Sequence, residues 1–470
     1  MTIEPTTGTA TQLGLELDAP ALIPALPIEP EWKDQPRLWG PALHPMCSYL
    51  ASFPAALAHA FIGRYSRRGD VVLDPFSGRG TTALQACAEG RVGVGNDLNP
   101  LAHLLTAAKV EPASRAETAT RLASLRLTWA AGADAWLTIA GEVLAELAAD
   151  RSGRPSVRVP AAASRRSDAR LETVPREVAV AFHARTLAQL LHLRTALDPA
   201  ERVDRFLAAA LTGILHGKSA SYLSPIMPNT FSMAPRYVRE FAARTAFAPP
   251  ERDAFAGLER KLARLHREPL PRTAGVALLG DARDVGGRAR AALAARGLPD
   301  RARLVVTSPP YLRVVKYGYY NWLRTWFLGE DAAAVDAVLD DAHHREPYLV
   351  FLREVLADLR PVLTDDAVVV LVIGDVETDR GRPLRGAVGL AEQVWAEAAA
   401  PEGYRLAGVA RDDVAPVRKM TKLWGSEAGR ATKTDRILVL GATEAGRRRA
   451  LTAARTPIDW DWPPRGLRAV

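Results

Sequence analysis

The chain has 470 residues, of which 48% are hydrophobic, and this length suggests two to three domain-sized units. Its formal net charge of +8 weakly favours a polyanionic partner, since an arginine-rich composition raises the charge of other proteins too. No apolar run has the roughly 20 residues that a membrane span needs, and the acidic, polar start is unlike a signal peptide. Two cysteines, Cys47 and Cys87, exclude a disulfide framework and a cysteine-based zinc site. We therefore expect a cytoplasmic protein with no membrane partner and no metal.

The first strongly patterned stretch follows a Pro-rich, aperiodic segment, residues 1–40, which predicts an extended arm. Residues 71–73 predict a strand that runs into a glycine-containing loop and then into a helix from about Thr81. A second short strand, residues 92–95, follows and ends at Asn96 and Asp97. This order predicts the start of a parallel α/β sheet.

The pattern changes to helical periodicity in residues 112–269. We predict a mostly helical insertion here and treat it as a candidate DNA-recognition region. Within it, residues 151–170 are rich in Arg, Ser, Gly and Pro and predict an exposed loop. Residues 216–241 are rich in Ser, Pro, Tyr and Met, and they could either wall a base pocket or brace the core.

The alternation of strands and helices returns after residue 270. Apolar runs predict strands at residues 276–280, 303–307, 367–375 and 436–442. We therefore predict a doubly wound, Rossmann-like α/β sheet built from residues 41–111 and 270–445, followed by a C-terminal tail, residues 446–470. Ligands of such sheets bind outside the carboxyl ends of the strands, so the informative loops follow Leu73, Gly95, Gly280 and Thr307.

The loop after the first strand, DPFSGRGTT, has the composition of a ligand cradle. Glycines let the backbone turn sharply and approach a ligand, and the loop feeds a helix N-terminus. No Lys-Ser/Thr pair follows Gly80, so the loop is not a nucleoside-triphosphate P-loop. Asp97 lies about 20 residues further on, where an acidic side chain accepts hydrogen bonds from a ribose diol.

Three stretches resemble amino-methylating DNA methyltransferases: DPFSGRGTT resembles their motif I, GNDLNPLA their motif II, and the stretch from His44 to Asp70 their motif X. The resemblance implies a methyltransferase sheet that binds S-adenosylmethionine. It implies that the Gly78/Gly80 loop cradles the amino acid end of the cofactor, that Asp97 holds its ribose and that Asp281 reaches its adenine amine. The cofactor-binding residues that we predict are Phe53, Pro54, Asp74, Phe76, Ser77, Gly78, Gly80, Thr81, Thr82, Asp97 and Asp281.

The stretch from Thr307 to Tyr311, TSPPY, resembles the catalytic motif IV of the same family. An exocyclic base amine is a poor nucleophile because its lone pair is delocalised into the ring. The Ser308 hydroxyl and a backbone carbonyl, that of Pro309, could accept its hydrogens and free that lone pair, while the prolines keep the carbonyls aimed. Tyr311 would stack on the flipped base. We predict Ser308, Pro309, Pro310 and Tyr311 as the catalytic residues.

These motifs predict a site-specific DNA methyltransferase that acts on the N4 amine of a flipped cytosine, with serine at position 308 favouring cytosine by resemblance. Adenine N6 is the close alternative, because the same pocket chemistry permits it. The motif order weakens the inference to cytosine, since the cofactor motif comes first here, whereas many N4-cytosine enzymes have the opposite order. An RNA base amine and a non-catalytic DNA-binding role are further alternatives. Methylation of cytosine carbon 5 is excluded, since it needs a Pro-Cys nucleophile and neither Cys47 nor Cys87 follows a proline.

Double-stranded DNA is the partner that we expect, in a nucleoid-associated location, and a cognate restriction endonuclease is a candidate second partner. Basic side chains in the insertion, after the catalytic motif and before the last strand are candidate phosphate contacts. They are Arg165, Arg166, Lys316, Arg418, Lys419 and Lys422.

Overall fold

A computed structural model gives the arrangement of most of the chain. It describes residues 23–50, 52–149, 158–160, 171–271, 273–310, 316–339, 345–374, 378–379, 382–383, 389–413 and 434–463.

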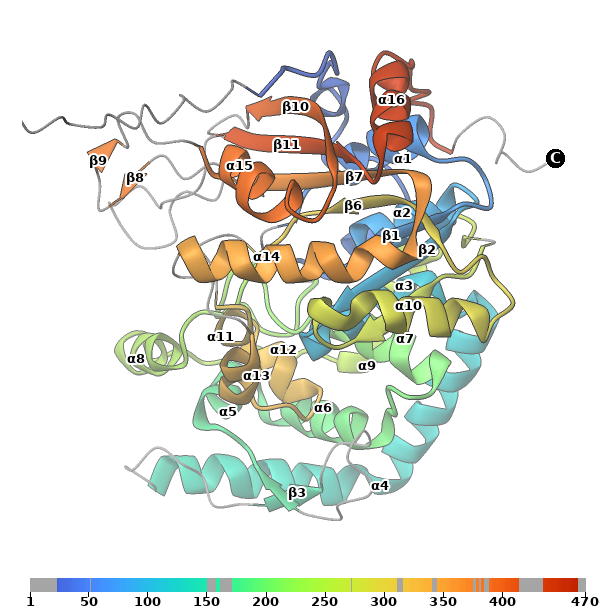
Figure 1. The fold of residues 1–470 in the computed structure, drawn as a ribbon. Helices are drawn as coiled ribbons and strands as arrows, with labels where there is room; N and C mark the ends of the chain where they lie inside the picture. Colours follow the sequence, from blue (N-terminus) through green and yellow to red (C-terminus); the bar gives the residue numbers. More distant parts are fainter. Residues whose placement is uncertain are drawn as a thin grey trace, which may run out of the picture.

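A seven-stranded sheet forms the centre of the structure (Figure 1), in the order β10-β11-β7-β6-β1-β2-β5. Its strands are β1 (Val71–Asp74), β2 (Val92–Asp97), β5 (Val276–Leu279), β6 (Ala302–Thr307), β7 (Leu363–Gly374), β10 (Arg405–Asp413) and β11 (Thr434–Gly441). Five neighbouring strands run parallel to one another: β7, β6, β1, β2 and β5. By contrast, β11 is antiparallel to both β7 and β10. This order confirms the predicted doubly wound, Rossmann-like sheet, with an antiparallel strand added near one edge.

Helices cover both faces of the sheet because its strands are apolar on both sides. Along β6, Val305 faces one core, whereas Leu304 and Val306 face the other. One face is covered by α10 (Val285–Ala294), α14 (Arg345–Leu359), α15 (Leu390–Gln393) and the π-helical segment η6 (Val394–Ala399). The other face is covered by α1 (Ala55–Tyr65), α2 (Thr81–Ala88), α3 (Pro100–Val110) and α16 (Glu444–Ala453).

The chain between α3 and β5 is mostly helical. It contains α4 (Arg115–Ala149), α5 (Arg176–Ala181), α6 (Ala184–Ala196), α7 (Arg202–Thr212), α8 (Pro235–Thr245) and α9 (Ala254–Leu265), with a small β3–β4 ladder (Arg158–Pro160 and Leu171–Thr173). These helices share one hydrophobic core with α3 and with a short helix after the catalytic motif, α12 (Trp322–Phe327). The helical region therefore packs against α3 and α12, and it lies below the sheet in the view of Figure 1.

The serine- and proline-rich segment 216–233 is attached to the helices that follow the catalytic motif. Arg324 of α12 is 1% exposed, and its guanidinium donates to the backbone carbonyls of Thr212, Asn229 and Thr230. The indole N–H of Trp322 donates to the carbonyl of Met233 at 2.6 Å. This segment therefore lies against the start of the region after the catalytic motif, together with α11 (Tyr317–Tyr320) and α13 (Ala332–Val338).

The described ends of the chain meet near the outer side of α1. Leu26 and Trp32, in the part preceding α1, are buried in the core beneath β10, β11 and α16. The indole N–H of Trp39 donates to the carbonyl of Trp460 at 3.0 Å, and the two rings lie edge to face. The short 3₁₀ turns η1 (Glu31–Lys33) and η2 (His44–Met46) belong to this region. Within the described ranges, no helix combines the length and apolar character that a membrane crossing requires.

Candidate functional site

The carboxylate of Asp74 joins the end of β1 to the end of β6. Asp74 is 2% exposed, and its Oδ1 accepts hydrogen bonds from the Thr307 hydroxyl at 2.6 Å and from the Phe76 backbone N–H at 3.1 Å. Burial raises the pKa of the Asp74 carboxyl to about 7. The cofactor motif and the catalytic motif, more than 230 positions apart along the chain, are thus in direct contact through Asp74 and Thr307.

The loop after β1 needs its glycines. Gly78 has φ +51° and Gly80 has φ +76°, in the left-handed region that residues with a side chain rarely adopt. A Cβ on Gly80 would lie 2.9 Å from the Cα and the Oγ1 of Thr106 in α3. The hydroxyls of Ser77 and Thr106 are 2.9 Å apart, so the loop rests on α3 through a hydrogen bond as well.

Asp97, at the end of β2, is held against this loop. Its Oδ2 accepts the backbone N–H of Gly78 at 2.8 Å, and its Oδ1 accepts that of Asn99 at 2.9 Å. Burial raises the pKa of Asp97 to about 6, although these backbone N–H donors act in the opposite direction. The carboxylate is therefore fixed at the carboxyl ends of β1 and β2, where a doubly wound sheet binds its ligands.

Two tyrosines complete the surroundings of Asp97, and the sequence did not indicate either as a cofactor residue. The Tyr49 hydroxyl accepts a hydrogen bond from Asn99 Nδ2 at 3.1 Å, and the Tyr49 ring stacks on Tyr317 at 5.8 Å. Burial, and after it the charge of Asp97, raises the pKa of both phenols. Tyr49 lies in the stretch that resembles motif X, which was the one signal that could have identified it.

Asp281 follows β5 at the same edge of the sheet, but its carboxylate is engaged. It accepts from the backbone N–H of Arg283 at 2.9 Å and from the Arg283 guanidinium at 2.6 Å. These hydrogen bonds lower the pKa of Asp281. Beside it, the Phe76 ring lies 5.7 Å from that of Phe351 in α14, and the guanidinium of Arg283 lies over Phe351. A ligand that uses Asp281 would have to share this carboxylate with Arg283.

Ser308 directly follows β6 and the Thr307–Asp74 contact. Its Oγ is buried and has no hydrogen-bond partner among the described residues. Pro309 is buried and Pro310 half-buried. Since buried polar groups are nearly always hydrogen-bonded, this hydroxyl is free to pair with a group outside the described residues.

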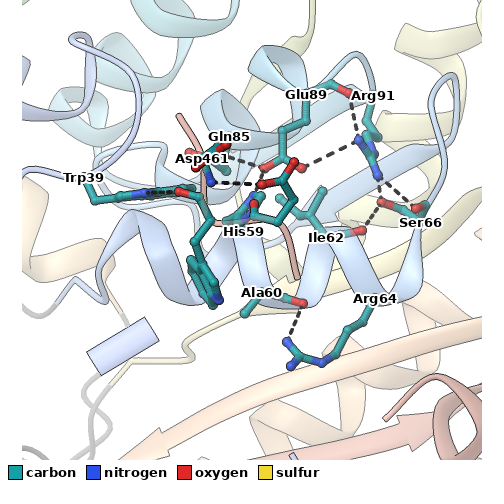
Figure 2. Close-up of polar contacts among 12 residues, drawn as sticks. Trp39, His59, Ala60, Ile62, Arg64, Ser66, Gln85, Glu89, Arg91 and Asp461 are labelled. Atoms are coloured by element: carbon teal, nitrogen blue, oxygen red, sulfur yellow. Dashed lines mark hydrogen bonds and ion pairs between the residues drawn. The ribbon is translucent and has the colours of Figure 1, made fainter. Parts of the chain in front are cut away.

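The helices that lead into the site are joined behind it by a buried polar cluster (Figure 2). Glu89, at the end of α2, is 3% exposed, and its Oε1 is 2.7 Å from both His59 Nδ1 in α1 and Gln85 Nε2 in α2. Arg91 lies 3.6 Å from the other oxygen of Glu89 and donates to the Ser66 carbonyl after α1. These contacts keep α1 and α2 side by side.

Predicted cofactor residues lie just before α1 and in the first turn of α2. Phe53 and Pro54 lead into α1, while Thr81 and Thr82 begin α2. Thr82 Oγ1 donates to the Val306 carbonyl of β6 at 3.0 Å, so a hydrogen bond also joins the start of α2 to β6.

The described residues thus include most of the predicted site. Around the carboxyl ends of β1, β2 and β6, the structure brings together Phe53, Pro54, Asp74, Phe76, Ser77, Gly78, Gly80, Thr81, Thr82, Asp97 and Ser308. Lys316 is exposed at the start of α11. Tyr311 and the candidate DNA contacts Arg165, Arg166, Arg418, Lys419 and Lys422 lie outside the described residues. In the described ranges, no group of three or more His, Cys, Asp or Glu side chains is arranged to hold a metal ion.

Residues 29–107 match a family model described as a DNA methylase, N6_N4_Mtase. Over 49 residues, the chain is 47% identical to the type II methyltransferase M.MthZI of Methanothermobacter thermautotrophicus. This match spans 10% of the chain and 14% of that relative, so the chain covers about a seventh of the relative's length. The predicted resemblance to amino-methylating DNA methyltransferases is therefore confirmed over this segment, which supports S-adenosylmethionine as the methyl donor.

Two solved structures show weak overall similarity. TrmN from Thermus thermophilus is 12% identical, with a TM-score of 0.28, over 83% of this chain and 50% of that chain. The rRNA methyltransferase aviRa from Streptomyces viridochromogenes is 12% identical, with a TM-score of 0.29, over 85% of this chain and 88% of that chain. Similarity at this level gives no indication of the substrate.

Proposed function

We propose that this chain is a DNA methyltransferase that transfers the methyl group of S-adenosylmethionine to the N4 amine of a flipped cytosine. The observation that carries the proposal is the buried hydroxyl of Ser308, which has no hydrogen-bond partner among the described residues and lies one residue beyond the hydrogen bond between Thr307 and Asp74. The N6_N4_Mtase match over residues 29–107 supports the same class of reaction.

The residues at the carboxyl ends of β1 and β2 fit the proposed cofactor. Gly78 and Gly80 provide the left-handed backbone conformations by which the loop turns into α2, and the Asp97 carboxylate is held where it can accept two ribose hydroxyls. S-adenosylmethionine supplies a methyl group on a sulfonium, which needs no metal or covalent enzyme intermediate to be transferred to a nitrogen.

Ser308 and its neighbours would activate the target amine. The Ser308 Oγ and the carbonyl of Pro309 would accept the two amine hydrogens, which localises the lone pair on the nitrogen as it attacks. Both acceptors are preorganised, because Thr307 is anchored to Asp74 and two prolines, Pro309 and Pro310, follow Ser308. A base must leave the duplex to reach this position, and the stacked rings of Tyr49 and Tyr317 lie near Asp97.

The test is to incubate the purified chain with duplex DNA, RNA and S-adenosylmethionine in separate reactions, and to identify methylated nucleosides by mass spectrometry after digestion. We expect N4-methylcytosine in DNA. N6-methyladenine would mean that the activation chemistry is right and the base wrong, an alternative favoured by the order of the motifs. Methylation of RNA alone would make the substrate wrong, and 5-methylcytosine would overturn the mechanism.

A further inference from the structure

Arg79 stands between the two glycines of the cofactor loop, Gly78 and Gly80. Its Nε donates to Thr81 Oγ1 at 3.2 Å, and its Nη2 lies 3.4 Å from the carbonyl of Phe53, just before α1. In the described part of the chain, the guanidinium has no carboxylate partner. Burial lowers the pKa of Arg79 to about 10, which still leaves it charged at neutral pH. A half-buried arginine with only neutral acceptors is ready to receive an anion.

A buried lysine supports this loop from behind. Lys109 of α3 is fully buried, and its Nζ donates to the backbone carbonyl of Arg79 at 2.5 Å and to that of His44 at 3.4 Å. Burial, and after it the charge of Arg79, lowers the pKa of Lys109. Lys109 also has no carboxylate partner among the residues that the structure describes. Burial therefore favours the neutral amine of Lys109, so the positive charge at this end of the loop is that of Arg79, and Lys109 anchors the backbone that carries it.

The other end of the same loop is acidic. Asp74 accepts the N–H of Phe76, and Asp97 accepts the N–H of Gly78, whereas Arg79 turns toward Phe53. A ligand that matches this distribution has hydroxyl groups at the Asp97 end and an anionic group at the Phe53 end. S-adenosylmethionine has this distribution, since its ribose and its α-carboxylate lie on opposite sides of the sulfonium.

We infer that Arg79 is the counter-ion of the α-carboxylate of S-adenosylmethionine, and that it selects for nucleosides that carry this carboxylate. This inference rests on the proposed function. The planar guanidinium can meet a carboxylate with two parallel hydrogen bonds, which favours arginine over lysine at such a position. Lys109 would act as a positioning residue, because it holds the backbone from which Arg79 projects.

The test compares two ligands that differ only in the carboxylate: S-adenosylmethionine and decarboxylated S-adenosylmethionine. Their dissociation constants are measured by calorimetry with the full chain and with Arg79→Met. In the unaltered chain we expect the carboxylate to improve affinity about ten- to hundredfold, as a charge-assisted, partly buried pair does. In Arg79→Met this preference should disappear, while the affinity for the decarboxylated ligand stays the same.

The matched control is Arg37→Met, which removes an exposed cation close enough to lower the pKa of Arg79. We expect this variant to keep the preference for the carboxylate, because the charge of Arg37 acts on Arg79 from a distance and Arg37 would not contact the ligand. Arg79→Lys should retain part of the preference for the carboxylate, since lysine keeps the charge but cannot make the two parallel hydrogen bonds of a guanidinium.

The outcomes separate this inference from the proposed function. If the unaltered chain binds neither ligand, the proposed cofactor itself is wrong. If it prefers S-adenosylmethionine and Arg79→Met keeps that preference, the role of Arg79 is wrong and the cofactor stands. If Arg79→Met weakens both ligands equally, Arg79 merely shapes the loop. A duplex DNA is titrated in the same way, and if Arg79→Met weakens only its binding, the anion is a DNA phosphate. Each of the last two results would also overturn the inference.

Discussion

Asp97 is the residue whose removal tests the cofactor crevice most directly. Asp97→Ala removes the carboxylate that Gly78 and Asn99 hold in place, and with it the acceptor for two ribose hydroxyls. Unpaired polar ligand groups typically cost about 1–3 kcal/mol, so the affinity for S-adenosylmethionine should fall about tenfold or more. Calorimetry on the folded variant measures this. An unchanged dissociation constant would remove Asp97 from the site.

Ser308 should act mainly in the transition state, because the target nitrogen needs its acceptors most as it becomes nucleophilic. Ser308→Ala should lower the single-turnover rate roughly 10²- to 10³-fold, as the loss of one preorganised polar group does. The affinities for cofactor and DNA should stay nearly the same. A near-normal rate in this variant would contradict the role given to Ser308.

At the scale of elements, the cluster around Glu89 holds α1 and α2 together. Glu89→Ala would leave His59, Gln85 and Arg91 without their shared acceptor in a buried place. Removing one partner of such a buried group costs about 3 kcal/mol, so the free energy of unfolding should fall by about that amount in urea titrations.

The control for this variant is Glu444→Ala, which removes an ion pair with Arg447 from the surface of α16. Exposed pairs contribute at most about 1 kcal/mol. If both variants lose the same small amount of stability, then the Glu89 cluster is not what joins the two helices.

The elements that the sequence predicted correctly are those with strong local patterns. The strands at β1, β2, β5, β6, β7 and β11 lie within a few residues of the predicted ones, because runs of Val, Ile and Leu favour strands buried on both faces. The strand β10 (Arg405–Asp413) was not predicted, since RLAGVARDD mixes small and charged residues at the sheet edge. The strand β11 pairs with β10 on one side and with β7 on the other, and a local sequence pattern does not predict either pairing.

The same distinction applies to the site. The glycines, Asp74, Asp97 and Ser308 occur in compact motifs at strand ends, so their proximity could be predicted from the rule for parallel sheets. The roles of these residues stay predictions. The stacking of Tyr49 on Tyr317 and the contact of segment 216–233 with Arg324 join residues far apart in the chain, and tertiary packing alone determines them.

At the scale of the whole molecule, the buried acids make stability depend on pH. Burial raises the pKa of Asp74 to about 7 and that of Asp97 to about 6, from a usual value of 3.8. The folded chain therefore keeps these protons to a higher pH than the unfolded chain does. The resulting stabilisation is present below pH 4 and is lost as the pH rises to about 7, by at most about 1.4 kcal/mol per pH unit for each group.

Urea unfolding at a series of pH values measures this dependence, and Asp74→Asn should flatten it. The amide oxygen can still accept from Thr307 and Phe76, but it carries no charge to be buried. The exposed carboxylate of Asp365 provides a control, and Asp365→Asn should leave the slope unchanged. A slope that is the same in Asp74→Asn and in the unaltered chain would show that Asp74 titrates normally.

The contact between Trp39 and Trp460 brings the two described ends of the chain together at one place. The order of the elements along the chain can therefore change while their arrangement in space stays the same. A circular permutant joined there and opened between α9 and β5 would pass through Ser308 before it reached Asp74. Every strand would keep its neighbours, with β1 still between β2 and β6. The order in which the cofactor and catalytic motifs are translated is thus free to differ between chains that build the same crevice.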